Sequence, residues 1–294
     1  MSKIILIVGP TGTGKTKLSI ELSHMLNAEV INADSTQIYK EPCISTAKIT
    51  EEEKESVIHH MIDLVSLNDD YTLYDYQKEA RKVLDKLISE NKNVVIVGGS
   101  GLYVKALLYN YNLSSEIKSD IDLSIYSNEE LKSMADKISK NDIHVNNRQR
   151  LERFITKFNN TSSITIKSDE INSKLYNFTS IGLTAPREIL YQKINDRVDK
   201  MIDNGLLEEA KRLYDLNLKN YNNIIDLKEL VPYFKNEITL EEAKEQIKKD
   251  TRHYAKRQLT WFNNQMKDIK WFNTDYDNFT NTINEVKEYL ERSN

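Results

Sequence analysis

A glycine-rich loop directly after a short apolar run constrains the fold of this chain most. Residues 4–8 are all Ile, Leu or Val, as expected of a strand buried in a parallel sheet. The residues that follow fit the pattern G-x-x-x-x-G-K-[ST], namely Gly9, Pro10, Thr11, Gly12, Thr13, Gly14, Lys15 and Thr16. The backbone N–H groups of such a loop and the N-terminus of the next helix wrap a diphosphate or triphosphate. Lys15 would supply positive charge, and Thr16 is placed to hold Mg²⁺.

The pattern of apolar runs predicts an α/β fold. Residues 29–33 and 94–97 repeat the short apolar strand, and Thr72 with Asp75 predicts a capping box that opens a helix between them. Strands that alternate with helices form parallel sheets, with ligands bound at the carboxyl ends of the strands. We therefore expect a P-loop NTPase-like parallel sheet flanked by helices.

The pattern changes in the middle of the chain. Residues 112–172 contain no glycine, are rich in Ser, Asn, Asp and Lys, and show short helical segments such as 129–138. After a strand at residues 178–183, helices are expected as far as the C-terminus. We therefore predict a catalytic core of residues 1–111 and 173–294, with a helical C-terminal region, and a small helical insertion of residues 112–172.

Composition excludes several classes of protein. No stretch approaches the roughly 20 consecutive apolar residues that span a bilayer, so we expect no membrane association and a cytoplasmic location. Cys43 is the single cysteine, which rules out an intrachain disulfide and a cysteine-based zinc site. The formal charge of −4 argues against a protein that coats nucleic acid wholesale.

Local charge differs from the overall balance. Residues 244–270 contain eight Lys or Arg, including Lys256 and Arg257, against three acidic residues. A solvated helix face would account for these charges. The aromatic residues among them, Tyr254, Trp261 and Phe262, favour a surface that binds nucleic acid.

Two further groups follow expected strands. Asp34 comes directly after residues 29–33, where it could bind Mg²⁺ through water or accept a proton from a nucleophile. A helix N-cap is the alternative for this residue. Gly98, Gly99 and Gly101 follow residues 94–97 and permit close approach of backbone to a ligand.

Taken in order, these segments resemble one family. They read GPTGTGKT, DSTQIY from Asp34, STAK from Ser45, HHMID from His59, GGSGLY from Gly98 and RHYAKRQLTWF from Arg252. The series is similar to that of the tRNA dimethylallyltransferases, and the resemblance extends from about residue 4 to residue 272. P-loop kinases share the first motif but not the series.

The resemblance implies a substrate and a set of roles. The loop would hold the diphosphate of dimethylallyl diphosphate, assisted by Arg197, and Asp34 would act as general base on the adenine N6 of an adenosine beside the anticodon. Mg²⁺ is the implied cofactor, and the anticodon loop of tRNA is the implied partner. We expect the enzyme to be a monomer. The segments that match tRNA-contacting positions contain Ser35, Thr36, Gln37, Ser100, Gln149, Arg150 and Arg153.

One departure from the family pattern concerns residues 225–228, which read Ile-Asp-Leu-Lys where the family has Ile-Gly-Tyr-Lys.

Three alternatives to a tRNA-modifying enzyme stay open. A kinase of a nucleoside or metabolite would use the same loop for ATP and Asp34 for a substrate hydroxyl. A related prenyltransferase would act on free AMP, ADP or ATP. A non-enzymatic P-loop protein would bind RNA without turnover.

Overall fold

Two compact units make up the chain. The computed structural model describes residues 2–111, 113, 122–160 and 173–292. One unit comprises Met1–Tyr109 with Lys174–Asn294, and the other comprises Asn110–Ser173. Residues 112, 114–121 and 161–172 of the expected insertion lie outside the described residues.

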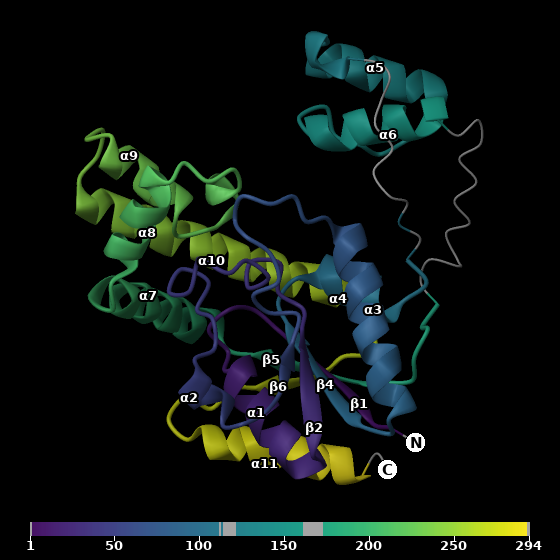
Figure 1. The fold of residues 1–294 in the computed structure, drawn as a ribbon, viewed down its shortest axis with the longest axis vertical. Coiled ribbons are helices and arrows are strands. Elements are labelled where there is room, and N and C mark those ends of the chain that lie inside the picture. The colour runs from purple at the N-terminus through teal and green to yellow at the C-terminus, as the bar shows by residue number, and fades with distance from the viewer. Residues whose placement is uncertain (1, 112, 114–121, 161–172, 293–294) are drawn as a thin grey trace. The chain divides into compact units, whose positions relative to one another are not determined.

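A sheet of six parallel strands forms the centre of the larger unit, in the order β3-β2-β4-β1-β5-β6 (Figure 1). The strands are β1 (Ile4–Val8), β2 (Ala28–Asn32), β3 (His59–His60), β4 (Asn93–Gly98), β5 (Thr179–Thr184) and β6 (Lys270–Asn273). The parallel α/β fold expected from the apolar runs is therefore confirmed.

Helices cover both faces of this sheet (Figure 1). The helices of the larger unit are α1 (Lys15–Leu26), α2 (Glu51–Lys54), α3 (Leu73–Ser89), α4 (Gly101–Leu108), α7 (Arg187–Asp203), α8 (Leu206–Asp215), α9 (Val231–Phe234), α10 (Leu240–Gln265) and α11 (Phe279–Arg292), with 3-10 turns at Tyr221–Asn223 and Lys228–Leu230. A capping box opens α3 at Thr72, as the sequence predicts, and another opens α10 at Thr239. None of the described helices combines the length and apolar character that a bilayer crossing requires.

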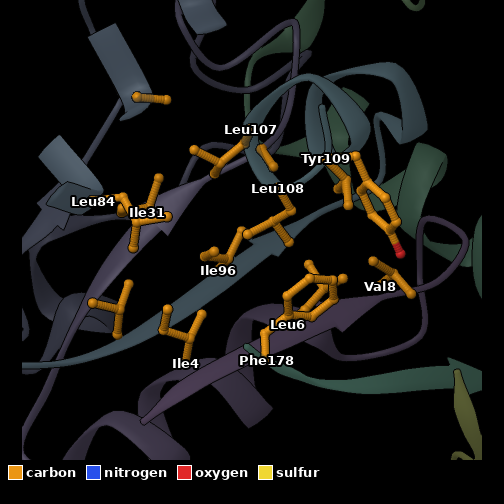
Figure 2. Close-up of a cluster of buried hydrophobic side chains, with 14 of the residues drawn as sticks. Ile4, Leu6, Val8, Ile31, Leu84, Ile96, Leu107, Leu108, Tyr109 and Phe178 are labelled. Atoms are coloured by element: carbon orange, nitrogen blue, oxygen red, sulfur yellow. The ribbon is translucent and has the colours of Figure 1, made fainter. Parts of the chain in front are cut away.

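Alternation along β1 divides the core between the two faces. Ile4, Leu6 and Val8 point to one face, where they join buried side chains of α3 and α4 such as Leu84 and Leu107 (Figure 2). Ile5 and Ile7 point to the opposite face and pack with α1 and α11. Each strand residue is thus buried on one side or the other, which is why the strand reads as a continuous apolar run.

The expectation of helices alone after β5 is wrong, because β6 precedes α11. Its register pairs Gly182 with Trp271 and Leu183 with Phe272. Only Phe272 of its four residues is buried. An edge strand with one buried side chain lacks the apolar run that marks β1 and β4.

The smaller unit packs its own short helices. They are a 3-10 turn (Leu123–Ile125), α5 (Asn128–Ile138) and α6 (Arg148–Asn160). Its buried side chains form a separate core that includes Leu131, Leu151 and Ile155. On α6 the side chains of Gln149, Arg150 and Arg153 are exposed.

Candidate functional site

The glycine loop occupies the turn from β1 to α1. Gly12 and Gly14 adopt φ angles of 84° and 83°, a left-handed conformation that residues with a side chain adopt at a cost. The carbonyl oxygen of Pro10 accepts hydrogen bonds from Thr13 Oγ1 at 2.9 Å and from Lys15 Nζ at 2.7 Å. These two hydrogen bonds within the loop therefore stabilise its conformation.

The carboxyl ends of β2 and β4 meet beside this loop. A side chain at Gly98 would lie 2.1 Å from the carbonyl oxygen of Ala33, so only glycine permits this approach. Ser100 then receives a hydrogen bond on Oγ from the backbone N–H of Ser35 at 3.0 Å, and the two hydroxyls lie 3.1 Å apart. The segments that follow the two strands are thus joined directly.

Asp34 follows β2 and is oriented by its neighbour. Its Oδ1 accepts hydrogen bonds from the backbone N–H of Thr36 at 3.0 Å and from the Thr36 hydroxyl at 2.8 Å. No helix begins at this point, so the alternative of a helix N-cap is wrong. Among the described residues no donor reaches Oδ2, which leaves that oxygen available to a ligand.

These segments line one cavity of about 220 Å³ in the larger unit. The glycine loop contributes Thr11, Lys15 and Thr16, the segment after β2 contributes residues 34–37, and α7 contributes Arg197. A second pocket, lined also by Gly12 and Gly14 of the loop, shares Lys15, Thr16 and Arg197 with this cavity. The cations that lie far apart in the sequence are therefore brought together.

Helix α10 closes the cavity with Gln258. The Oε1 of Gln258 accepts a hydrogen bond from the backbone N–H of Thr11 at 2.9 Å, and its Nε2 donates to the carbonyl oxygen of Gly99 at 3.0 Å. One buried amide thus ties the glycine loop to the turn after β4. Tyr254, one helical turn earlier, lines the cavity from the same face.

The cavity is electrostatically suited to an anion. Burial lowers the pKa of Lys15 to about 8; Asp34 opposes this shift, whereas Arg197 reinforces it. Burial also lowers the pKa of Arg197, against the attraction of Asp226 and Asp34. Neither cation forms an ion pair with a described carboxylate, so both can compensate the charge of a bound ligand.

Asp226 brings a carboxyl group into the same cavity. It adopts a φ angle of 81° in the segment where the family pattern has glycine, and it is buried. Its backbone N–H donates to Glu229 Oε2 at 2.8 Å, and its Oδ1 accepts from the Thr251 hydroxyl at 3.2 Å. Burial, with a contribution from Glu229, raises the pKa of Asp226 to about 7.

The residues expected to contact tRNA fall into three groups. Ser35, Thr36 and Gln37 line the cavity, and Ser100 supports them from the N-cap of α4. Lys256 and Arg257 are exposed on α10, in a shallow groove that also contains Trp261. Gln149, Arg150 and Arg153 belong to the smaller unit and are described there alone.

Some of the cations in residues 244–270 form ion pairs within the protein, and others do not. Lys248 pairs with Asp199 at 2.8 Å, and Lys244 pairs with Glu241 at 3.1 Å. Lys256 and Arg257 form no ion pair with a described residue, and the Arg257 guanidinium lies 5.8 Å from the centre of the Tyr254 ring. Lys249, Lys267 and Lys270 are likewise exposed and form no ion pair with a described residue, so the excess of positive charge is spread along the stretch.

Sequence reasoning missed several residues of the cavity. Tyr254 and Gln258 are four residues apart, the spacing that places side chains on one face of a helix, and this was the signal that could have found them. Asp226 was marked only by its departure from the family pattern. Among the described residues no three His, Cys, Asp or Glu side chains gather as a metal site.

Comparisons with known proteins agree on one family. A family model described as IPP transferase matches residues 37–265. The tRNA dimethylallyltransferase of Anoxybacillus flavithermus is 41% identical over 98% of this chain and 96% of its own length. That of Bacillus subtilis is 42% identical over 92% of this chain and 90% of its own length.

Solved structures give the same result. A tRNA isopentenylpyrophosphate transferase from Staphylococcus epidermidis matches with a TM-score of 0.75 and 35% identity, and each chain is covered completely. A eukaryotic dimethylallyltransferase described as acting on tRNA matches with a TM-score of 0.84 and 26% identity, over 99% of this chain and 80% of its own.

The raised pKa of Asp226 predicts a pH-dependent stability. Because the folded-state pKa of about 7 lies above the ordinary value of 3.8, ionisation costs more in the folded protein. The contribution of the neutral carboxyl to stability is present below pH 4 and is lost as the pH rises through 7. Asp226→Asn cannot ionise, and asparagine tolerates a positive φ angle. We expect this variant to melt at a higher temperature than the parent at pH 8, with a much smaller difference at pH 4.5.

Melting curves across this pH range provide the measurement. Asp215→Asn, at an exposed position of α8, controls for the loss of a surface carboxylate and should shift the curve little. If the melting temperatures of the Asp226→Asn variant and the parent differed by the same amount at every pH, the raised pKa of Asp226 would be contradicted.

Proposed function

The chain belongs to the IPP transferase family and is a tRNA-modifying prenyltransferase; from that premise we propose how its cavity works. The dimethylallyl group of dimethylallyl diphosphate is transferred to N6 of the adenosine immediately 3′ of the anticodon in tRNA. The products are N6-dimethylallyladenosine and diphosphate. The observation that carries this proposal is the meeting of Lys15 and Arg197, without ion pairs to described carboxylates, in one cavity with Asp34.

The proposed diphosphate site is the glycine loop with Gly9, Pro10, Thr11, Gly12, Thr13, Gly14, Lys15 and Thr16, together with Arg197. Negative charge develops on the diphosphate as the C–O bond breaks. Lys15, Arg197 and the N–H groups of the loop are fixed beforehand, so they stabilise that charge without a cost of reorganisation. The second pocket, which is lined by Gly12 and Gly14 and shares Lys15 and Arg197, supports this placement.

Asp34 is the proposed general base. The N6 nitrogen forms a bond to the allylic carbon, the C–O bond to diphosphate breaks, and the N6 proton passes to Asp34. Thr36 holds Oδ1 through two hydrogen bonds, which leaves Oδ2 to accept the proton. A base held in this way adds a useful but moderate factor to the rate.

The residues present fit a Mg²⁺ ion. The Thr16 hydroxyl and the Asp34 carboxylate line the same cavity and are hard oxygen donors, and Mg²⁺ is commonly held by one or two such groups with phosphate oxygens and water. When bound, the ion would help to neutralise the leaving diphosphate. Thr16 is the proposed direct ligand, and Asp34 the proposed ligand through water.

The tRNA is proposed to bind through three sets of residues. Ser35, Thr36 and Gln37, supported by Ser100, would contact the target nucleoside, which must leave the stack of the anticodon loop to reach the cavity. Lys256 and Arg257 would contact backbone phosphates. Gln149, Arg150 and Arg153, exposed on α6, would add RNA-binding residues from the insertion. We propose that the enzyme works as a monomer in the cytoplasm.

The named relatives favour this activity over phosphate transfer by a kinase.

The first prediction from the proposed function concerns the ligand of the glycine loop. In calorimetric titrations with Mg²⁺, dimethylallyl diphosphate and pyrophosphate should bind to the protein, and Lys15→Ala should abolish most of this binding. Lys17→Ala, an exposed neighbour on α1, is the matched control and should bind normally. Tight ATP binding with phosphate transfer to a small acceptor would overturn the assignment.

The second prediction concerns Asp34→Asn, which keeps the size of the side chain but removes the proton acceptor and the charge. Single-turnover rates should fall by roughly 10²- to 10⁴-fold, with little change in tRNA affinity. If the carboxylate acts mainly on Mg²⁺, excess metal should recover much of the rate. Turnover close to that of the parent enzyme would eliminate the catalytic role, and exposed Asp277→Asn serves as the control.

The third prediction concerns the exposed cations Lys256 and Arg257 of α10. Replacing Lys256 and Arg257 together by alanine should weaken tRNA binding and reduce its salt slope by roughly 0.7 to 0.9 for each backbone phosphate that the variant no longer neutralises. Filter binding across a salt series measures this slope. Replacement of Lys78 and Lys82, which are exposed on α3, removes the same charge and should leave the slope unchanged. Equal salt slopes for both double variants would show that Lys256 and Arg257 contact no tRNA phosphate and belong to a solvated helix face.

A further inference from the structure

Glu209 is a buried carboxylate on the first turn of α8 that serves a segment far away in the sequence. Its Oε2 accepts hydrogen bonds from the backbone N–H groups of Cys43 at 2.8 Å and Ile44 at 3.0 Å. Its Oε1 accepts from the backbone N–H of Ser45 at 3.0 Å and from the Ser45 hydroxyl at 2.9 Å. Four donors from three consecutive residues therefore converge on one side chain.

The charge of Glu209 is compensated by these donors. No ion pair joins it to a described cation, and the residue is only 8% exposed. A buried carboxylate is costly unless every oxygen is hydrogen-bonded, and hydrogen bonds to a charged group are stronger than neutral ones. The position near the N-terminus of α8 adds a favourable interaction with the helix dipole. The arrangement therefore holds residues 43–45 firmly.

Residues 43–45 in turn fix a tight turn that forms part of the cavity wall. The backbone N–H of Ala47 donates to the carbonyl oxygen of Ile44 at 2.9 Å, and that of Lys48 donates to the carbonyl oxygen of Cys43 at 3.0 Å. Ala47 adopts a φ angle of 43°, which is unfavourable for a residue with a side chain. Such a conformation persists only where surrounding contacts enforce it, and the four bonds to Glu209 supply them.

The turn presents two carbonyl groups to Gln37. The Nε2 of Gln37 donates to the carbonyl oxygens of Thr46 at 3.2 Å and Ala47 at 3.3 Å. A flipped amide would set its oxygen against both carbonyls, so the orientation of the amide is determined. Gln37 lines the cavity, and no described donor reaches its Oε1. That oxygen is left as an acceptor for a ligand.

We propose that Glu209 is a positioning residue for the transfer reaction, because it fixes the turn of residues 43–47 that orients the Gln37 amide. Gln37 Oε1 then accepts a hydrogen bond from an N–H group of the tRNA nucleoside. The inference rests on the proposed function, in which Gln37 faces the target nucleoside. Glu209 acts only through this turn and touches no substrate.

Glu209→Gln tests the proposal with a side chain of the same size. The new amide group turns an N–H donor toward backbone donors, so the turn loosens and Gln37 loses its fixed orientation. The KM for tRNA should rise about tenfold, the change expected when a hydrogen bond to a charged group is removed. The affinity for dimethylallyl diphosphate, set by the glycine loop, should stay within about twofold. Glu208→Gln, exposed on the same turn of α8, is the matched control and should change neither value.

A double-mutant cycle separates positioning from a general loss of stability. If Glu209 acts through Gln37, Glu209→Gln should have little further effect on the KM for tRNA in a Gln37→Ala background. Additive effects, or a lower melting temperature with unchanged kinetic constants, would overturn the proposal. If Glu209→Gln does not fold, Ser45→Ala replaces it in the cycle, removing one of the four bonds; an unchanged or additive effect on the KM would then overturn the proposal.

The same samples distinguish failure of the inference from failure of the proposed function. If the parent protein transfers no prenyl group to tRNA, the proposed function fails, and the dissociation constant for tRNA replaces the KM in the cycle. If transfer proceeds normally but the cycle is additive, only the role of Glu209 fails.

Discussion

Two cations, Lys15 and Arg197, share one cavity without a carboxylate partner among the described residues, and much of the site is arranged around them. Burial disfavours their charged forms, as the pKa of about 8 for Lys15 shows. Among the described residues, Asp34 and Asp226 attract the Arg197 charge without forming an ion pair with it. A bound anion would supply the negative charge that compensates these two cations. The cations would stabilise a leaving diphosphate most strongly as its own negative charge develops.

Helix α10 connects this anion site to the rest of the cavity. Gln258 bonds to Thr11 of the glycine loop and to Gly99 of the turn after β4, so the helix and two strand ends are held together. The same helix also exposes Lys256 and Arg257. One element thus links the proposed site of chemistry to the proposed site of phosphate binding, and it explains why a single stretch of sequence carries both kinds of residue.

The sequence predicts the parts of this structure that depend on local pattern. Residues 4–8 and 94–97 form strands because each residue is buried on one face of the sheet or the other, and Thr72 and Thr239 cap helices through hydrogen bonds to residues three positions along the chain. Strand β6 could not be predicted, because its pairing with β5 joins segments nearly 90 residues apart and leaves only Phe272 buried. Asp226 lines the cavity and Glu209 binds residues 43–45 through tertiary contacts, and no local sequence pattern predicts either contact. Arg197 was placed by resemblance alone, since an arginine in an amphipathic helix is ordinarily solvated.

We infer that the cavity holds an allylic diphosphate, whose allylic group the protein transfers to an adenosine in tRNA. Incubation of the full chain with dimethylallyl diphosphate, Mg²⁺ and unmodified tRNA, followed by digestion to nucleosides and mass analysis, tests it most directly. We expect N6-dimethylallyladenosine, located by fragment analysis at the position immediately 3′ of the anticodon, and released diphosphate in equal amount. Recovery of unmodified nucleosides from tRNA that the protein demonstrably binds, or modification of free adenine nucleotides alone, would contradict it.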